Sequence, residues 1–173
     1  MDALACLGCG IVLPSHDGPV HPYMTSSPAC WAKYGEVLAR EFGNAEYRRA
    51  HRLTVDAYAV QHPGCPSRQS TQSVAVHLIS LHAVLELGWN HQRATALIRA
   101  AADHGQFVWL EPPKTRGVLN ILHVVAAHSS DMHVTAVHEW ASAAWAAWEQ
   151  HHQQVRAWAA MRAVTPNYGL ERP

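Results

Sequence analysis

Apolar side chains recur every three or four residues along most of the chain after residue 27, which is the spacing of one face of an α-helix. Ser27-Pro28 supplies an N-cap followed by proline at the first helical position, and the apolar spacing continues to Gly43. A first helix is therefore predicted over residues 28–42. The same spacing, with Asn, Gly and Pro at its boundaries, predicts further helices over residues 44–61, 68–87, 90–105, 120–128 and 132–163.

Two segments lack this period. Residues 1–27 are rich in Gly, Pro and Ser and form an irregular lobe that needs an organiser, and residues 106–119 contain a double proline that predicts a surface crossing. The chain is therefore expected to be mainly α, a bundle of about five helices with an irregular N-terminal lobe. A single domain over residues 1–173 is expected, divided into the lobe (1–27), the bundle (28–163) and a tail (164–173) that begins before Pro166.

Composition excludes several partners. Charged residues make up 15% of the chain and the formal net charge is zero, so neither nucleic acid nor an anionic membrane surface is expected as a partner. The sequence has no apolar run of about 18 residues and no secretion signal at its start, which predicts a soluble cytoplasmic protein. In that compartment thiols stay reduced, so four cysteines favour metal binding over disulfides.

The cysteines near the start have the spacing of a zinc knuckle. Cys6 and Cys9 are separated by two residues and followed by Gly10, a combination that turns two thiolates toward one ion. Cys30 begins the first predicted helix, where the amide dipoles favour a thiolate, and His21 lies between. A structural Zn²⁺ held by three cysteines and His21 is the resulting hypothesis. Other candidates for the fourth ligand are His16, His51 and His62.

Zinc would account for the order of the lobe. Metal ligation contributes about 10 kcal/mol to the folding of small modules, enough to order a segment that buries little of its own surface. The simpler alternative is that Cys6 and Cys9 are reduced, partly exposed thiols and Cys30 a small buried side chain. A third alternative is a thiol redox pair formed by Cys6 and Cys9.

A second group of polar side chains predicts a pocket. His51, Tyr58 and His62 share one stripe of the second predicted helix, and Gln72 and His77 lie on an unusually polar face of the third. These five residues are the candidates for a catalytic or binding pocket. Three imidazoles would suit a second metal, whether zinc, iron or copper, whereas one imidazole beside a phenol and an amide would suit a ligand without metal. Asp56 lies off the stripe and is expected to pair with Arg or to support a ligand.

Several strings resemble an uncharacterised bacterial family, catalogued as a domain of unknown function, over residues 6 to 158. They are CxxCG, HPY, the pair Cys30-Trp31, VDAYAVQHPG, Arg68-Gln69-Ser70, Gln72-Ser73, WLEPP and His151-His152. The resemblance implies one domain and points to Cys6, Cys9, His21, Cys30 and His62, whereas Cys65 lies outside the shared pattern. It implies no reaction.

Together these features predict a zinc-binding helical metalloprotein with a zinc-knuckle lobe and a histidine-lined polar pocket. Its expected role is that of a metal-dependent enzyme or a binder of a small molecule. The alternative is an interaction module in which zinc is purely structural and the histidines hold the fold together. No substrate, reaction class or oligomeric state follows from the sequence.

Overall fold

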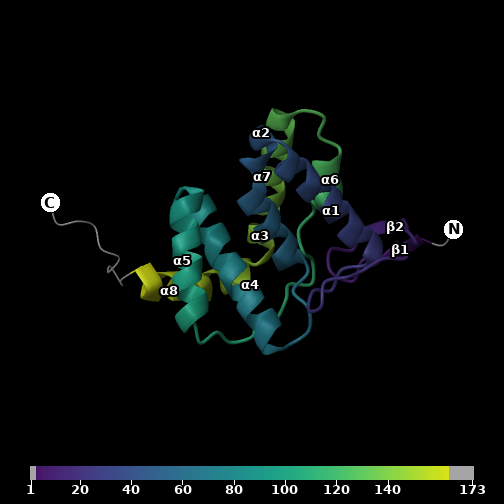
Figure 1. Ribbon diagram of the computed structural model, residues 1–173. Helices are drawn as coiled ribbons and strands as arrows, with labels where there is room; N and C mark the ends of the chain where they lie inside the picture. The colour runs from purple at the N-terminus through teal and green to yellow at the C-terminus, as the bar shows by residue number, and fades with distance from the viewer. Residues whose placement is uncertain (1–2, 164–173) are drawn as a thin grey trace.

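The computed structural model describes residues 3–163 and is mainly α, as predicted. The helices are α1 (Pro28–Gly43), α2 (Ala45–Arg48), α3 (His51–Gln61), α4 (Arg68–Leu81), the π-helix η1 (His82–Glu86), α5 (His91–His104), α6 (Ile121–Val125), α7 (Ser130–Ala147), the 3₁₀-helix η2 (Glu149–His151) and α8 (His152–Ala163). Figure 1 shows α3 between α4 and α7, with α1, α2 and α6 toward one end and α5 and α8 toward the other. The expected tail, with Pro166, lies outside the described residues.

The helices begin where the sequence supplies caps. Ser or Asn side chains accept backbone N–H groups of the first turn, and these bonds satisfy donors that a helix start leaves unpaired. The capping residues are Ser27, Asn44, Ser67, Asn90, Asn120 and Ser129. Local hydrogen bonding therefore fixes most of the starts that were predicted from the same residues.

Three predicted helices are each divided. The helix expected over 68–87 changes from α4 to the π-helix η1 after Leu81. The helix expected over 44–61 breaks after Arg48, because the Ala50 amide donates to the Tyr47 carbonyl three residues back instead of continuing the α pattern. The helix expected over 132–163 breaks at Trp148, where a tight turn leads into η2. Trp148 donates its indole N–H to the Val60 carbonyl of α3 at 3.2 Å, and this contact between helices fixes the position of the break.

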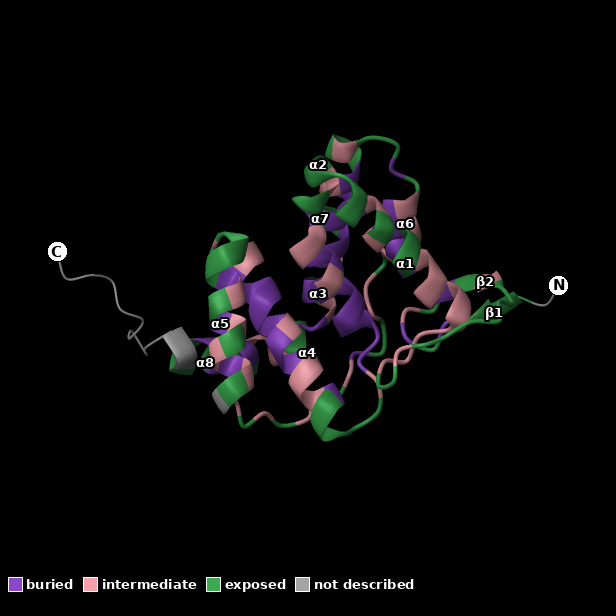
Figure 2. Ribbon diagram, in the orientation of Figure 1, coloured by how far each residue is buried: buried purple, intermediate pink, exposed green. Residues whose placement is uncertain are grey.

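The core is continuous from α1 to α8. Figure 2 shows the buried residues concentrated on α3, on the inner face of α7 and along α4. The tryptophans of the last predicted helix pack there: Trp140 is 0% exposed, Trp148 1% and Trp158 4%. Large rings interleaved with alanines therefore fill the space between helices. No helix within residues 3–163 has the length and apolarity needed to cross a membrane.

Gln61 anchors the crossing that follows α5. Its amide nitrogen donates to the carbonyls of Arg116 and Leu119, both at 2.7 Å, and its side-chain oxygen accepts the Trp140 indole N–H at 2.8 Å. Gln61 is 1% exposed and Trp140 0%, so the bond between these two side chains is buried. The residue before His62 therefore holds residues 116–119 against α3 and α7.

The N-terminal lobe is less irregular than predicted. Strands β1 (Ala3–Ala5) and β2 (Val12–Pro14) form an antiparallel hairpin in which Ala3 pairs with Pro14 and Ala5 with Val12. Figure 1 shows the hairpin projecting from the end of the bundle beside the start of α1. Most of its side chains are exposed, so the hairpin contributes little apolar burial of its own.

Candidate metal centre

The turn of the hairpin carries the first two cysteines. The Cys6 amide donates to the Ile11 carbonyl, and the Gly10 amide donates back to the Cys6 carbonyl, both at 2.8 Å. Gly10 has φ of 79°, the left-handed conformation in which a side chain would be strained. These bonds fold the CxxCG segment into a tight knuckle and turn both sulfurs to the same side, as its spacing predicts.

Two helix ends supply the remaining groups. Cys30 lies in the first turn of α1, where its amide donates to the capping oxygen of Ser27 at 3.2 Å. His62 caps the C-terminus of α3, which cannot continue because Pro63 follows. The Nδ1–H of His62 donates to the Tyr58 carbonyl at 2.7 Å, and this bond leaves Nε2 free to act as a ligand.

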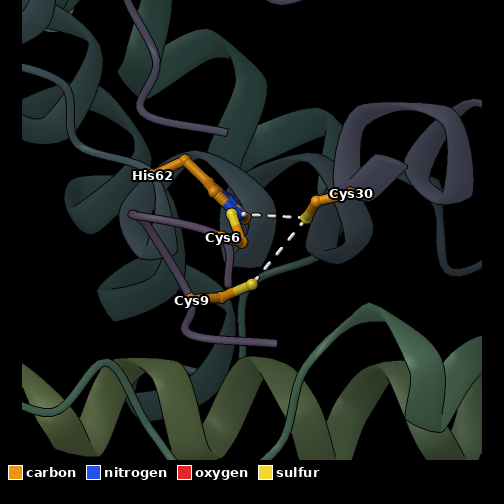
Figure 3. A group of neighbouring side chains, drawn as sticks. All are labelled: Cys6, Cys9, Cys30 and His62. Atoms are coloured by element: carbon orange, nitrogen blue, oxygen red, sulfur yellow. Dashed lines mark hydrogen bonds between the residues drawn. The ribbon is translucent and has the colours of Figure 1, made fainter. Parts of the chain in front are cut away.

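The four side chains converge on one point (Figure 3). The sulfurs of Cys9 and Cys30 are 3.7 Å apart, and the Cys30 sulfur is 3.4 Å from His62 Nε2. All four ligand atoms lie within 4.8 Å of one another; they belong to Cys6, Cys9, Cys30 and His62. A tetrahedral ion with bonds of about 2.3 Å to sulfur places its sulfur ligands about 3.7 Å apart. The group therefore has the size of a mononuclear site.

The centre is enclosed by protein. Cys6 is 2% exposed, Cys30 0% and His62 1%, whereas Cys9 is partly exposed. Gly8, between the two knuckle cysteines, lies directly against the His62 ring and the Thr25 carbonyl, so that a β-carbon at this position would collide with both. The close approach of hairpin and helix thus depends on the absence of a side chain at Gly8.

Donors around the sulfurs favour their ionised form. The Ser27 amide donates to the Cys6 sulfur at 3.4 Å, and the Tyr58 hydroxyl donates to the Cys30 sulfur at 3.5 Å. The Tyr58 ring is stacked on His62, with centroids 4.0 Å apart, and on Tyr34 at 3.9 Å. These contacts fix the orientation of the ligands and stabilise negative charge on sulfur.

The three thiols of the group differ in how readily they ionise. Hydrogen bonds from Cys30 and Cys9 lower the pKa of Cys6, whereas hydrogen bonds to Cys6 and Cys9, together with burial, raise the pKa of Cys30. At Cys9 the bond with Cys30 favours the thiolate, but the bond with Cys6 and burial outweigh it and raise the pKa to about 11. Hydrogen bonding and burial thus favour the thiolate at Cys6 and the neutral thiol at Cys9 and Cys30, and a bound cation would favour the ionised form of all three.

The fourth member of the group is His62 and not His21. The His21 ring instead packs edge-on against Tyr23, with centroids 4.3 Å apart, and against Trp31 at 5.3 Å. His21 was expected because it is close to the knuckle in sequence, whereas the end of α3 brings the more distant His62 against Cys30. His16 and His51 also lie outside the group of four.

The five residues of the predicted pocket are not gathered into one site. Tyr58 and His62 belong to the metal centre, while His51, 11 residues before His62, begins the same helix about 16 Å away. His77 projects from α4 to the carboxylate of Asp56, and Gln72 donates to the carbonyl of Ala102 at 3.2 Å. The two imidazoles of the predicted stripe, His51 and His62, therefore lie at opposite ends of α3.

Buried carboxylates hold the imidazoles that the metal centre does not use. Glu41 accepts bonds from Thr54 at 2.5 Å, His51 at 2.8 Å and His133 at 3.0 Å. Burial alone would raise the pKa of Glu41, but these bonds outweigh it and lower the pKa. The side chains therefore form a charge network between α1, α3 and α7.

Asp56 forms a second such network, between α3 and α4. It is 0% exposed and accepts bonds from Arg52 at 2.6 Å, His77 at 2.8 Å and Ser80 at 2.5 Å. Burial would raise the pKa of Asp56, and the bonds from His77 and Arg52 lower it. The expected pairing of Asp56 with an arginine is thus present, and this pairing stabilises the buried negative charge of Asp56.

The remaining cysteine, Cys65, is exposed and lies outside the group, in agreement with the pattern expected for it. Neither a curated protein nor a solved structure gives a significant match to this sequence. A family model does match, over residues 4–149, which include all four residues of the metal centre. The chain therefore belongs to DUF5946, a family of unknown function.

Proposed function

We propose that the protein binds one Zn²⁺ through Cys6, Cys9, Cys30 and His62, and that this ion has a structural role. The observation that carries the proposal is the set of four convergent ligand atoms within 4.8 Å of one another. Structural zinc sites use four protein ligands from cysteine and histidine, whereas catalytic sites keep one position open for water or substrate. Four ligands in an enclosed site support the structural role.

The ligand set favours zinc among the common metals. Thiolate and imidazole suit zinc and iron, whereas calcium and magnesium prefer oxygen. Clusters with several iron atoms need sulfur ligands farther apart than in this group, because the ligands bind different irons. A single tetrahedral ion remains, and zinc is the usual occupant of such sites.

Nearby groups offset the net charge that the site would carry with zinc bound. Three thiolates, one neutral imidazole and Zn²⁺ sum to one negative charge. Arg116 lies near enough for the charges of Cys6 and Cys9 to raise its pKa, although burial lowers the pKa by more. The Tyr58 hydroxyl adds a hydrogen bond at Cys30. A half-buried guanidinium and polar donors thus offset the excess charge on sulfur.

The ion would tie the hairpin to the helices. Cys6 and Cys9 come from the hairpin, which buries little apolar surface, and the other two ligands come from the ends of α1 and α3. Zinc ligation contributes about 10 kcal/mol in small modules, far more than this hairpin gains from packing. The position of residues 3–14 would therefore depend on the metal.

Elemental analysis of the purified protein tests the proposal. We expect one equivalent of zinc per chain, retained in His21→Ala but lost or strongly weakened in His62→Ala and Cys9→Ser. The His21 variant is the matched control, since it removes an imidazole that packs beside the site without joining it. Loss of zinc from His21→Ala with retention in His62→Ala would refute the ligand set, and one equivalent of iron would refute the metal.

A further inference from the structure

A polar pocket lies between the start of α4 and the end of α5. Its volume is about 530 Å³, within the usual range for sites of small molecules. Arg68 and Gln72 line it from α4, Asp103 from the end of α5, and Phe107 and Trp109 from the crossing. Three sequence motifs outside the metal centre therefore contribute residues to this pocket: Arg68-Gln69-Ser70, Gln72-Ser73 and WLEPP.

Two opposite charges face this pocket. Among the side chains that the structure describes, which are those of residues 3–103 and 105–161, neither the Arg68 guanidinium nor the Asp103 carboxylate has a partner in an ion pair or a side-chain hydrogen bond, although both line the same cavity. A guanidinium presents a fork of donors that matches a carboxylate, and an aspartate accepts bonds from an ammonium group. The pocket thus offers complementary partners for a molecule that carries both charges.

The other walls are held in place by the fold. The Gln72 amide nitrogen donates to the Ala102 carbonyl at 3.2 Å, which joins α4 to α5 at the pocket and leaves the side-chain oxygen available. The Phe107 ring packs edge-on against Trp158, with centroids 5.0 Å apart, and against Gly105, where a β-carbon would collide with the ring. Aromatic surface is therefore fixed beside the two charges.

We propose that this pocket binds a free α-amino acid. Arg68 binds its carboxylate, Asp103 binds its ammonium group, and the side chain of the ligand lies against Phe107 and Trp109. A polyanion such as a nucleotide is disfavoured, because Asp103 offsets Arg68, the one cation among the described residues of the lining. The proposal does not depend on the metal, since none of the lining residues belongs to the metal centre.

Calorimetry with three related probes tests the assignment on the full zinc-loaded chain. The probes are phenylalanine, phenylalaninamide, which lacks the carboxylate, and N-acetylphenylalanine, which lacks the ammonium group. We expect phenylalanine to bind about tenfold or more tightly than either analogue, because each analogue loses a charge-assisted interaction. Glutamine, with the same backbone groups, tests whether the aromatic wall selects the side chain.

Single substitutions then identify which residue binds the carboxylate of the ligand and which binds its ammonium group. In Arg68→Gln, phenylalanine and its amide should bind equally, whereas in Asp103→Asn, phenylalanine and its N-acetyl derivative should bind equally. Arg99→Gln and Asp17→Asn alter exposed charges outside the pocket and should leave all three affinities unchanged. Both pocket residues are exposed, so these variants should keep the thermal stability of the parent chain.

The outcomes that overturn the proposal are specific. Equal affinities of the parent protein for phenylalanine and its two analogues would exclude recognition of a zwitterion. Failure of both phenylalanine and glutamine to bind at millimolar concentration would exclude the class of ligand. The two proposals can also fail separately. If Cys9→Ser loses zinc but still binds the amino acid, the pocket is independent of the metal. If Arg68→Gln loses amino-acid binding but keeps its zinc, the metal centre is independent of the pocket.

Discussion

The Nδ1–H group of His62 is bonded to the carbonyl of Tyr58, four residues earlier on the same helix, at 2.7 Å. This bond assigns the proton to Nδ1 and leaves Nε2 with its lone pair toward the Cys30 sulfur, 3.4 Å away. The hydroxyl of the same Tyr58 donates a hydrogen bond to that sulfur at 3.5 Å. One residue therefore supports two of the four members of the metal centre.

Tyr58→Phe should weaken zinc binding without unfolding the protein. The substitution removes the hydroxyl beside Cys30 and keeps the ring that stacks on His62 and Tyr34. Loss of such a supporting bond typically lowers metal affinity by about 10-fold to 100-fold. Competition with a chromophoric chelator measures the change, and an affinity equal to that of the parent would show that the hydroxyl has no role.

Gly8→Ala should disrupt the metal centre. A β-carbon there collides with the His62 ring and the Thr25 carbonyl, so hairpin and helix must separate. We expect reduced zinc content and a lower melting temperature. Gly35→Ala is the control: this glycine lies within α1 with open space around it, so alanine should stabilise the helix by about 0.5–1 kcal/mol. A Gly8 variant that keeps its zinc and its melting temperature would contradict the geometry.

Thiol reactivity should separate Cys65 from the other cysteines. Cys65 is exposed and lies outside the group, so it should react with iodoacetamide at once. Cys6, Cys9 and Cys30 should react only after a chelator removes the metal, because a bound thiolate is a poor nucleophile. Mass spectrometry counts the modified thiols at each stage. Rapid modification of Cys6 and Cys9 before chelation would instead favour the redox alternative.

Stability at low pH should depend on Glu86. Bonds from Arg156 at 2.7 Å and from His82 at 2.7 Å lower its pKa from 4.5 to about 2, so the folded state favours the carboxylate. The stabilisation is therefore complete above about pH 4.5 and is lost as the pH falls through about 2.

The comparison with Glu86→Gln measures this contribution. The parent should unfold at higher denaturant concentration than the variant at pH 6, and the difference should shrink steadily between pH 4.5 and pH 2. Metal loss at low pH affects both proteins alike, so it cancels in the difference. A gap between the two proteins that stays constant over this interval would show that the ion pair does not contribute.

Local patterns carried most of the helix prediction. Ser and Asn caps, prolines and apolar spacing act within a few residues, so they can be read from the chain itself. The break at Trp148 could not be predicted in this way, because it depends on a hydrogen bond from the Trp148 indole to the Val60 carbonyl, 88 residues away along the chain. The break after Arg48 likewise has no proline or glycine to mark it.

The metal centre likewise depends partly on local signals and partly on contacts between distant parts of the chain. Cys6, Cys9 and Cys30 could be predicted, since their spacing, Gly10 and the cap at Ser27 are local signals. The choice of His62 over His21 depends on how α3 packs against α1, which the spacing does not encode. One signal was nevertheless present in the chain: His62 directly precedes Pro63, which ends the helix at this histidine.

The residues of the predicted pocket lie apart in the structure for a related reason. Helical spacing placed His51 and His62 on one stripe correctly, but the length of α3 separates them. The partners of His51 and His77 are buried carboxylates from α1 and α3, and only the folded arrangement reveals those pairings.

The ligands of the metal centre are spread from the sixth residue to the sixty-second. During synthesis the knuckle emerges first, and at that stage it offers a metal only two sulfurs. The complete set exists only after α1 and α3 have been made and have docked. Under the proposed function, capture of the ion would therefore come late and would depend on correct assembly of the bundle, and a chain misfolded around α3 would leave the thiols of Cys6 and Cys9 open to oxidation.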